Sequence, residues 1–323
     1  MGNRLSVIIP VYNAAQYLNN TLDSVCNQTV FDEIEVIIMD DGSTDGSLDI
    51  CRSYERKHPN IKVYSQENQG VSAARNSAIR KATGEYITFL DSDDYVCEDL
   101  YEKELNLICT SGADIGVVDF YKKHEDGQEV KYRHDFQKKW KQSDQVLEDF
   151  FSGVVGNQVV DKIFSSKTIK DIEFPKNYKI GEDMWFMFLA LRNAQSVVLD
   201  TSIAGYYYIV RGSSAMTGTF SDKYFDPVKL SKRMCEEVSG NEKLQKYAKA
   251  HLIHETCKAL EYVYRHHAES KCKAKVKEMR QELRHYSAKD GYSYLIRKQF
   301  YGFILMRISP KLYLLIHKMM KIG

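Results

Sequence analysis

The sequence predicts an α/β protein with a mostly parallel sheet flanked by helices, followed by a helical C-terminal extension. Two observations support this prediction: short apolar runs alternate with segments of helical spacing, and polar residues gather where the apolar runs end. The chain has 323 residues, of which 43% are hydrophobic and only five are proline. A chain of this length suits one large packed domain with an appendage, or two domains.

Five short runs rich in β-branched residues are the expected strands. They span residues 5–12, 34–40, 61–66, 86–91 and 114–121. The intervals between them repeat apolar residues at helical spacing, as in Leu18, Leu22 and Val25. Strands that alternate with helices in this way indicate a parallel sheet covered by helices on both faces.

The rest of the chain is less regular. Residues 122–150 are polar and of mixed charge, which indicates a surface insertion or a hairpin followed by a helix. An aromatic run at 204–210 is a further strand candidate, and residues 222–290 have the spacing of helices. We expect Pro310 to divide the last apolar segment into two helices.

The number and spacing of the cysteines indicate the cellular compartment to expect. All seven are widely spaced, their number is odd, and no CxxC pair occurs. A disulfide framework or a zinc site is therefore not expected, and a reducing cytosol fits best. The apolar stretch near the start is interrupted by Pro10 and is too short for the core of a signal peptide.

Polar residues follow four of the expected strands. They stand at Asn13, at Asp40 and Asp41, at Asn68 and Gln69, and at residues 91–94. In an open α/β sheet the ligand site lies outside the carboxyl ends of the strands. These four positions therefore outline one site, in which Asp41 is placed to accept from a base N–H or a ribose hydroxyl.

The segment Asp91, Ser92, Asp93 and Asp94 is the densest of these clusters. Three carboxylates cannot all ionise so close together without a compensating cation. Hard cations such as Mg²⁺ and Mn²⁺ prefer carboxylate oxygens, and Mg²⁺ usually binds one or two carboxylates together with substrate phosphates. The alternative is a solvated acidic turn, in which Asp94 caps a helix at 94–108.

Two other kinds of site also use clustered acidic residues. An EF-hand calcium loop needs glycine at its sixth position, where this segment has Val96, so that site is excluded. A phosphatase with an aspartyl nucleophile also uses paired aspartates after a strand. It would leave the other strand-end residues without a role, and it stays a distant alternative.

Two further charged positions have two interpretations each. Arg75 lies in a helix of small residues and is either a surface arginine or packed tightly against the sheet. Glu182 and Asp183 precede the apolar segment WFMFLALR, where they suit the positive end of a helix. A carboxylate there could also take a proton from a substrate, and one residue can do both.

Five segments in order resemble the family 2 inverting glycosyltransferases, the bacterial enzymes that build capsule, exopolysaccharide, O-antigen and teichoic-acid glycans. They are VIIPVYN (7–13), DDGSTDGS (40–47), ENQGVSAARN (67–76), FLDSDD (89–94) and GEDMWF (181–186). The resemblance covers about residues 4–220. It implies the GT-A, or nucleotide-diphospho-sugar transferase, fold for residues 1–221. The nucleotide-sugar half would be about 1–120 and the acceptor half about 121–221.

The resemblance also implies roles for individual residues. Those assigned to the nucleotide-sugar are Pro10, Val11, Tyr12, Asn13, Asp41, Arg75, Asp91, Ser92 and Arg211. Asp93, in a DXD motif, would hold Mg²⁺ or Mn²⁺ on the diphosphate, and Asp183 would be the general base. Glu182, Trp185 and Lys162 would lie on the acceptor side, although Lys162 could equally be a solvated lysine.

The charge is divided unevenly. Residues 1–222 hold 23 Lys and Arg against 34 Asp and Glu, whereas residues 223–323 hold 22 against 10. Basic segments that alternate with apolar, aromatic runs indicate a helical region lying on an anionic membrane surface. The alternative is a helical lid on the catalytic domain. Nucleic acid ranks last, because no motif for it accompanies the charge.

The implied function is a metal-dependent inverting glycosyltransferase that takes a sugar from a UDP-sugar. Its acceptor would be a glycan, lipid-linked, at the cytoplasmic face of the cell membrane, where the protein would be peripheral. A non-catalytic nucleotide-sugar or glycan-binding module on the same fold is the alternative. The donor sugar, the linkage and oligomer formation are left open by the sequence.

Overall fold

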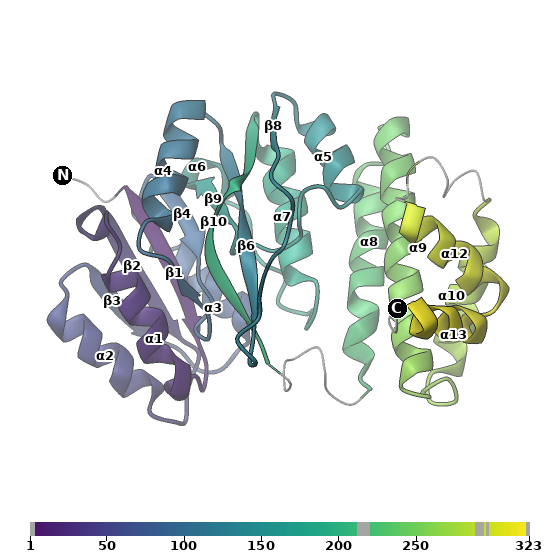
Figure 1. Ribbon diagram of the computed structural model, residues 1–323, viewed down its shortest axis with the longest axis horizontal. Coiled ribbons are helices and arrows are strands. Elements are labelled where there is room, and N and C mark those ends of the chain that lie inside the picture. Colours follow the sequence, from purple (N-terminus) through teal and green to yellow (C-terminus); the bar gives the residue numbers. More distant parts are fainter. Residues whose placement is uncertain (1–3, 212–219, 288–293, 295–296, 321–323) are drawn as a thin grey trace. The chain divides into compact units, whose positions relative to one another are not determined.

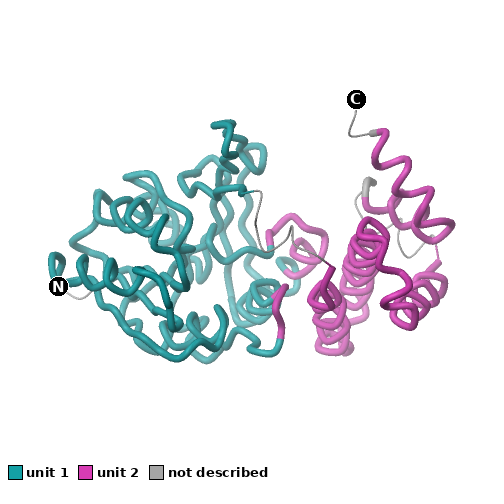
Figure 2. The backbone as a smooth tube through the Cα atoms, turned by 90° about the horizontal axis from the view of Figure 1, so that it is seen from below, with its two compact units in different colours: residues 1–146, 157–177, 182–214 teal, residues 147–156, 178–181, 215–323 magenta. Residues whose placement is uncertain are grey.

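The computed structural model describes residues 4–211, 220–287, 294 and 297–320 (Figure 1). The chain forms two compact units, coloured separately in Figure 2. The first comprises residues 1–146, 157–177 and 182–214, and the second comprises 147–156, 178–181 and 215–323.

The first unit starts with the predicted alternation of strands and helices. Its elements up to the acidic segment are β1 (Leu5–Val11), α1 (Ala15–Cys26), η1 (Phe31–Glu33), β2 (Ile34–Asp40), α2 (Ser47–Lys57), β3 (Ile61–Ser65), α3 (Val71–Ile79) and β4 (Tyr86–Phe89). β1 and β2 are buried along their whole length, as their continuous apolar runs require. The four strands pair in parallel, in the order β3-β2-β1-β4.

The sheet becomes mixed beyond β4. The following elements are β5 (Tyr95–Val96), α4 (Leu100–Ser111), β6 (Ile115–His124), β7 (Glu129–Lys131), β8 (Gln137–Trp140), α5 (Ser143–Phe151), β9 (Lys162–Ser165), α6 (Ser166–Ile169), α7 (Glu182–Asn193) and β10 (Val197–Val210). The order continues as β4-β9-β6-β10-β5, with β9 antiparallel to both its neighbours. The α/β class with flanking helices is confirmed, and residues 122–150 do form a hairpin strand followed by a helix.

Parallel pairing brings the predicted polar strand ends together. Because β1, β2, β3 and β4 run in the same direction, the residues that follow them emerge at one edge of the sheet. These residues are Tyr12, Asp41, Asn68 and the acidic segment 91–94. The site described below lies at this edge.

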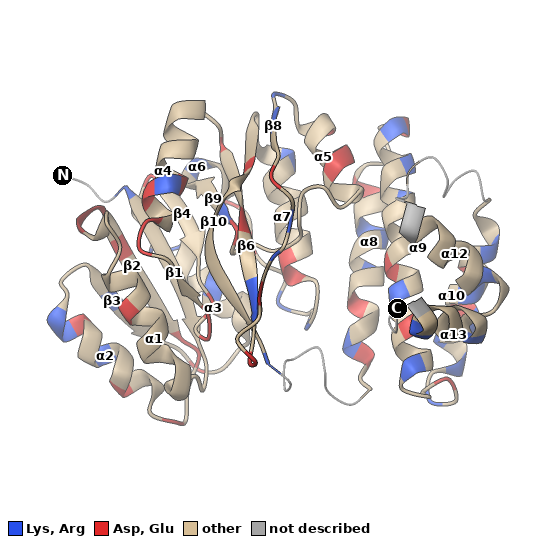
Figure 3. Ribbon diagram, viewed as in Figure 1, with Lys and Arg blue, Asp and Glu red and all other residues tan. Residues whose placement is uncertain are grey.

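The second unit is helical in its described part. Its elements are η2 (Asp222–Phe225), α8 (Asp226–Glu237), α9 (Glu242–Arg265), α10 (Lys273–His285), α12 (Arg297–Ile308) and α13 (Pro310–Met320). Ile253, Val263 and Phe303 belong to its buried apolar core. Pro310 opens α13, which confirms the predicted division of the last apolar segment. Lys and Arg are spread over these helices (Figure 3).

The lengths of the helices bear on membrane crossing. None of the helices in the described part of the chain combines the length and the apolar character that crossing a bilayer requires.

Candidate active site

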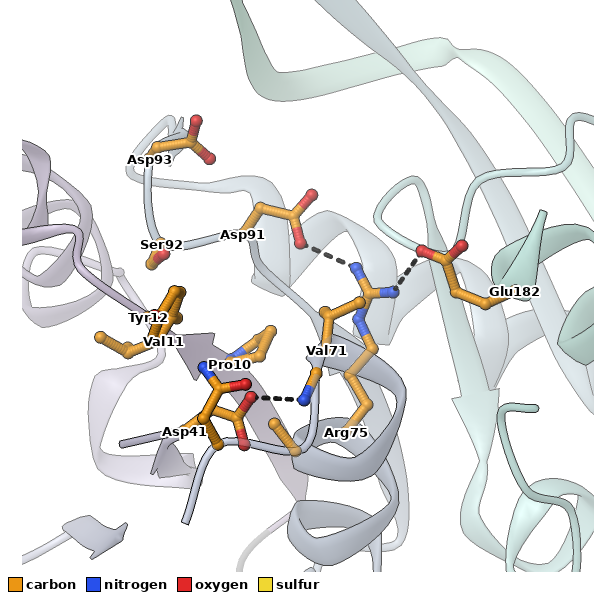
Figure 4. Close-up of a pocket in the computed structure, with 13 residues that line it drawn as sticks. Pro10, Val11, Tyr12, Asp41, Val71, Arg75, Asp91, Ser92, Asp93 and Glu182 are labelled. Atoms are coloured by element: carbon orange, nitrogen blue, oxygen red, sulfur yellow. Dashed lines mark hydrogen bonds and ion pairs between the residues drawn. The ribbon is translucent and has the colours of Figure 1, made fainter. Parts of the chain in front are cut away.

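A cavity of about 500 Å³ opens at the carboxyl edge of the parallel strands (Figure 4). It joins segments that are far apart in the sequence, from β1 to the start of α7. Its wall consists of Pro10, Val11, Tyr12, Asp41, Asn68, Gly70, Val71, Ala74, Arg75, Asp91, Ser92, Asp93 and Glu182. Most of the residues predicted for the nucleotide-sugar are therefore brought together.

Asn13 is not among the residues of this wall. Its backbone lies in the left-handed region, with φ of 49°, which asparagine adopts more readily than most residues. Its side-chain oxygen accepts a hydrogen bond from the backbone N–H of Thr44 at 2.8 Å. Asn13 thus fixes the turn after β1 to the loop after β2, and its role in the uridine pocket stays a prediction.

Asp41 is buried and ties two loops together. Its carboxylate accepts hydrogen bonds from the Gln66 side chain at 2.7 Å and from the backbone N–H groups of Gln69 and Gly70 at 3.0 and 2.7 Å. The next residue, Gly42, has φ of 73°, and a Cβ there would lie 2.9 Å from a backbone nitrogen of Asn68. The loop can approach this closely only because residue 42 is glycine.

Asp93 lies in the cavity wall and is paired with a positively charged residue, Arg211. Its carboxylate accepts a hydrogen bond from Arg211 Nη1 at 2.5 Å, and the Arg211 guanidinium lies 3.9 Å from the centre of the Tyr17 ring. Burial raises the pKa of Asp93, the charge of Asp91 raises it further, and Arg211 opposes both effects. Arg211, one of the residues predicted for the nucleotide-sugar, is thus found next to the predicted metal ligand. Residues 212–219, which follow Arg211, lie outside the described residues.

The prediction that Asp94 caps the next helix is wrong. A short strand, β5, follows Asp94, and α4 does not begin until Leu100, after Asp99. Asp94 is buried, and its carboxylate accepts hydrogen bonds from Tyr206 Oη at 2.6 Å and from the Ile209 backbone N–H at 2.8 Å. It holds the acidic segment against β10, and burial raises its pKa well above the ordinary value.

Arg75 is enclosed by carboxylates from two sides of the cavity. Its side chain is only 4% exposed, and its guanidinium contacts Asp91 Oδ1 at 2.9 Å and Asp183 Oδ1 at 2.7 Å. Glu182 Oε1 lies at 3.7 Å (Figure 4). The surface interpretation of Arg75 is therefore wrong. Arg75 joins the acidic segment after β4 to the start of α7.

Asp183 and Glu182 occupy the first turn of α7, as predicted. Burial raises the pKa of Asp183, and Arg75 counteracts part of that shift. Burial and the neighbouring charge of Asp183 raise the pKa of Glu182 to about 7. A carboxylate with a raised pKa is a stronger base once it is ionised, which suits a residue that must take a proton.

Lys162 and Trp185 are both buried. The Lys162 ammonium donates a hydrogen bond to Asp161, which also contacts Arg133 Nη1 at 3.2 Å. The interpretation of Lys162 as a solvated lysine is thus wrong, and burial lowers its pKa. Neither residue is in the cavity wall, and their place on the acceptor side stays a prediction.

Three wall residues were not predicted as site residues, namely Gly70, Val71 and Ala74, whereas Asn68 was among the strand-end residues expected at the site. Val71, Ala74 and Arg75 are spaced i, i+3 and i+4 on α3 and therefore share one face of that helix. This spacing around Arg75 is the signal that could have identified Val71 and Ala74. Tyr17, which lies against Arg211, had no such signal.

Comparisons with known proteins agree with this geometry. Residues 6–186 match the protein family described as glycosyl transferase family 2. The minor teichoic acid biosynthesis protein GgaB of Bacillus subtilis is 32% identical over 247 residues, which are 73% of this chain but 27% of GgaB. The putative glycosyltransferase EpsH of the same species is 31% identical over 258 residues, which are 76% of this chain and 72% of EpsH. The chain thus spans about a quarter of the length of GgaB.

The fold resembles that of a solved protein. A crystal structure of S. aureus TarS 1–349 in complex with UDP-GlcNAc matches with a TM-score of 0.70 at 22% identity, covering 96% of this chain and 89% of that one. The likeness confirms the predicted GT-A type of fold. The family match covers more than half of the chain and includes the cavity wall from Pro10 to Glu182. The chain therefore belongs to glycosyl transferase family 2.

Proposed function

We propose that this chain transfers a sugar from a UDP-sugar to a hydroxyl of a lipid-linked glycan, with inversion at the anomeric carbon, in cell-surface polysaccharide synthesis. The observation that carries the proposal is the separation of two acidic groups across one cavity. Asp91 and Asp93 stand in the wall on one side of Arg75, and Glu182 stands in the wall on its other side. Asp183, the residue after Glu182, is not itself a wall residue but contacts the Arg75 guanidinium. An inverting transfer needs this division, because the leaving diphosphate and the attacking hydroxyl lie on opposite faces of the sugar.

The donor is proposed from the cavity and from the solved neighbours. TarS has been crystallised in complex with UDP and with UDP-GlcNAc. In this chain, Tyr12 and Val11 lie in the wall beside Asp41 and provide apolar and polar surface for a base. We assign the uridine to this end of the cavity and the diphosphate to the end formed by Asp91 and Asp93.

A divalent cation fits the acidic end of the cavity. Among the described residues, no group of three or more His, Cys, Asp and Glu side chains is arranged to hold a metal by itself. Mg²⁺ does not need such a group when one or two carboxylates and the substrate phosphates complete its shell. Asp93 would hold the ion, with Asp91 adjacent. When bound, Mg²⁺ or Mn²⁺ would neutralise charge on the departing diphosphate.

The protein's own residues perform the remaining steps. Asp183 takes the proton of the acceptor hydroxyl, and Arg75 holds the Asp183 carboxylate in place through its contact at 2.7 Å. Asp41 and Asn13 keep the loops around the nucleotide fixed, so that binding costs little reorganisation. A non-catalytic binding module on the same fold would have no use for a base across the cavity from the diphosphate.

A panel of nucleotide-sugars tests the proposed donor and cation. We expect the purified chain to release UDP from a UDP-sugar in the presence of Mn²⁺ or Mg²⁺, slowly without acceptor, and to leave GDP- and ADP-sugars intact. EDTA should abolish the release. Asp93→Ala should bind Mn²⁺ more weakly, whereas exchange of an exposed aspartate on α2, Asp49→Ala, should not. Full UDP release in EDTA would exclude the cation, and preference for another nucleotide would exclude the UDP-sugar.

We further propose that α12 and α13 rest on an anionic membrane surface. Tyr301, Ile308, Leu315 and Met319 are 58–66% exposed, which is unusual for large apolar side chains. Lys311 and Lys318 are exposed on α13 beside Leu315 and Met319. No acidic residue follows Asp290. Exposed apolar side chains flanked by lysines are typical of helices that lie in a membrane interface.

Sedimentation with vesicles tests this surface. We expect the full chain to bind vesicles that contain phosphatidylglycerol, and to bind them more weakly at high salt. The double variant Leu315→Glu, Met319→Glu should reduce the fraction of protein bound to vesicles by about tenfold or more. It replaces apolar side chains that would be buried in the membrane interface by charged ones. Val130→Glu, at an exposed apolar residue of β7, is the matched control. Equal binding by both variants would contradict the proposal, and so would a full chain that stays in solution.

A further inference from the structure

We propose that a second cavity, lined by the residues next to the acidic segment, binds a neutral glycan chain. The cavity measures about 770 Å³, within the range of roughly 300–1,000 Å³ typical of ligand sites. It is formed by α1, by residues 95–99 and by the tips of β7 and β10. It shares no wall residue with the donor cavity. The inference deepens the proposed function, on which it rests, by giving the glycan a holding site of its own.

An aromatic ladder forms one side of this cavity. Tyr95 on β5 pairs with Tyr207 on β10, and their rings are nearly parallel with centres 4.7 Å apart. Tyr207 in turn pairs with Tyr121 on β6, at 5.3 Å. Lys123 donates a hydrogen bond to Tyr95 Oη at 2.9 Å. The rings are therefore fixed before any ligand arrives, which lowers the entropy cost of binding.

The rest of the wall carries uncommitted polar groups. In the described part of the chain, the side chains of Asn20, Asn27 and Glu98 form no hydrogen bond with other residues. Amides both donate and accept hydrogen bonds, and a carboxylate accepts two or more. Sugars present hydroxyl groups around their rim and C–H groups on the ring face, and the ring face packs on an aromatic ring. The end ring of the ladder, Tyr95, and the polar groups of the wall thus offer a counterpart for both kinds of sugar surface.

The charge of the cavity selects against anionic ligands. Asp99 is paired with Lys103 at 2.7 Å, and Glu129 is paired with Lys123 at 2.8 Å. Asp23 and Glu98 have no cationic partner among the described residues. The excess is therefore negative, and a phosphate or a uronate entering this cavity would be repelled. A nucleotide, an anionic lipid headgroup and nucleic acid fit poorly, whereas an uncharged saccharide fits.

The position suggests what such a site does. Ser92 and Asp93 face the donor cavity, and residues 95–99 of the same segment line the second cavity. The Thr21 hydroxyl on α1 fixes this segment, because its single hydrogen is shared between the backbone oxygens of Asp94 at 2.7 Å and Ser92 at 3.0 Å. A glycan in the second cavity would not compete with the donor and would stay on the enzyme between transfers.

Saccharide binding to the full chain tests the proposal. The probes are the neutral trisaccharides maltotriose, cellotriose and chitotriose and the anionic trigalacturonate, each at millimolar concentration, followed by saturation-transfer NMR and calorimetry. We expect at least one neutral probe to bind, to bind more tightly than trigalacturonate, and to keep its affinity when UDP is saturating. Tyr95 is the end ring of the ladder, whereas Tyr207 is covered by Tyr95 on one face and by Tyr121 on the other. Tyr95→Leu should therefore weaken that binding by about tenfold, the size of effect expected for one stacking ring.

A second variant is needed in case Tyr95→Leu does not fold. Asn20→Ala with Asn27→Ala changes only exposed side chains and should also weaken saccharide binding, whereas Asn106→Ala on the exposed face of α4 should not. UDP binding should be unchanged in all three. If no neutral probe binds a protein that binds UDP, or if both variants bind the probe like Asn106→Ala, the glycan site is disproved while the proposed donor stands. A protein that binds the saccharide but not UDP would instead disprove the donor.

Discussion

Replacing Asp183 by asparagine is expected to lower kcat of sugar transfer by about 10²–10⁴-fold, the contribution typical of a positioned general base. Asparagine keeps the size of the side chain but cannot take the proton of the acceptor hydroxyl. Because we assign UDP to the other end of the cavity, its affinity should stay within about twofold of wild type, a change of well under 1 kcal/mol. Steady-state kinetics and UDP calorimetry on the same preparations measure the two quantities.

Glu182→Gln is the matched control for this prediction. Glu182 precedes Asp183 on α7 and also faces Arg75, but at 3.7 Å rather than 2.7 Å. We expect this variant to retain most of the wild-type kcat. If Glu182→Gln loses the rate and Asp183→Asn keeps it, the base is Glu182, whose pKa is raised to about 7.

The pH profile gives an independent check. Burial raises the pKa of Asp183, so the protonated, inactive form should persist above the ordinary aspartate pKa of about 4. The rate of wild type should therefore rise with pH through that raised value, and the rise should be absent from the residual activity of Asp183→Asn. Since Asp183 and Glu182 lie side by side, the apparent pKa values belong to the pair.

The fold was predictable where the periodicity of the sequence is strong. The strands at 5–12 and 34–40 are continuous apolar runs, and the structure places β1 and β2 within one residue of them. The antiparallel insertion of β9 between β4 and β6 was not predictable, because it depends on pairing between segments about 75 residues apart. Local periodicity indicates a strand but does not reveal its neighbours.

The site was predictable in composition but not in its internal contacts. Asp91, Asp93 and Asp183 were assigned from motifs, and the structure brings Asp91 and Asp183 to one guanidinium, that of Arg75. The burial of Arg75 and of Asp94 depends on partners more than 100 residues away, at Asp183 and Tyr206. A sequence window around either residue contains no such partner. Asp94 was therefore predicted to cap a helix, and Arg75 was left with two interpretations.

Replacing Arg75 by leucine is expected to destabilise the first unit by about 3 kcal/mol, near the lower end of the cost of breaking a buried ion pair, because the acidic partners keep some contact with water. Asp91, Glu182 and Asp183 would face one another without their cation. Transfer should also be lost, because Asp183 would lose the ion pair with Arg75 that orients its carboxylate. Urea denaturation followed by tyrosine and tryptophan fluorescence measures the stability.

Arg80→Leu is the control on the same helix. Arg80 is exposed and contacts Glu173 at 3.3 Å, and an exposed pair of this kind contributes about 1 kcal/mol or less.

The pH dependence of the stability of Arg75→Leu separates loss of charge from loss of packing. In Arg75→Leu the uncompensated carboxylates acquire raised pKa values in the folded protein, so they bind protons more readily there than in the unfolded chain. The loss in free energy of unfolding of Arg75→Leu relative to wild type should therefore grow from about pH 5 to about pH 8. It should shrink again on acidification. A deficit that is constant over this range would mean that Arg75 acts through packing on Phe174, whose ring lies 5.3 Å from its guanidinium carbon, rather than through the three carboxylates.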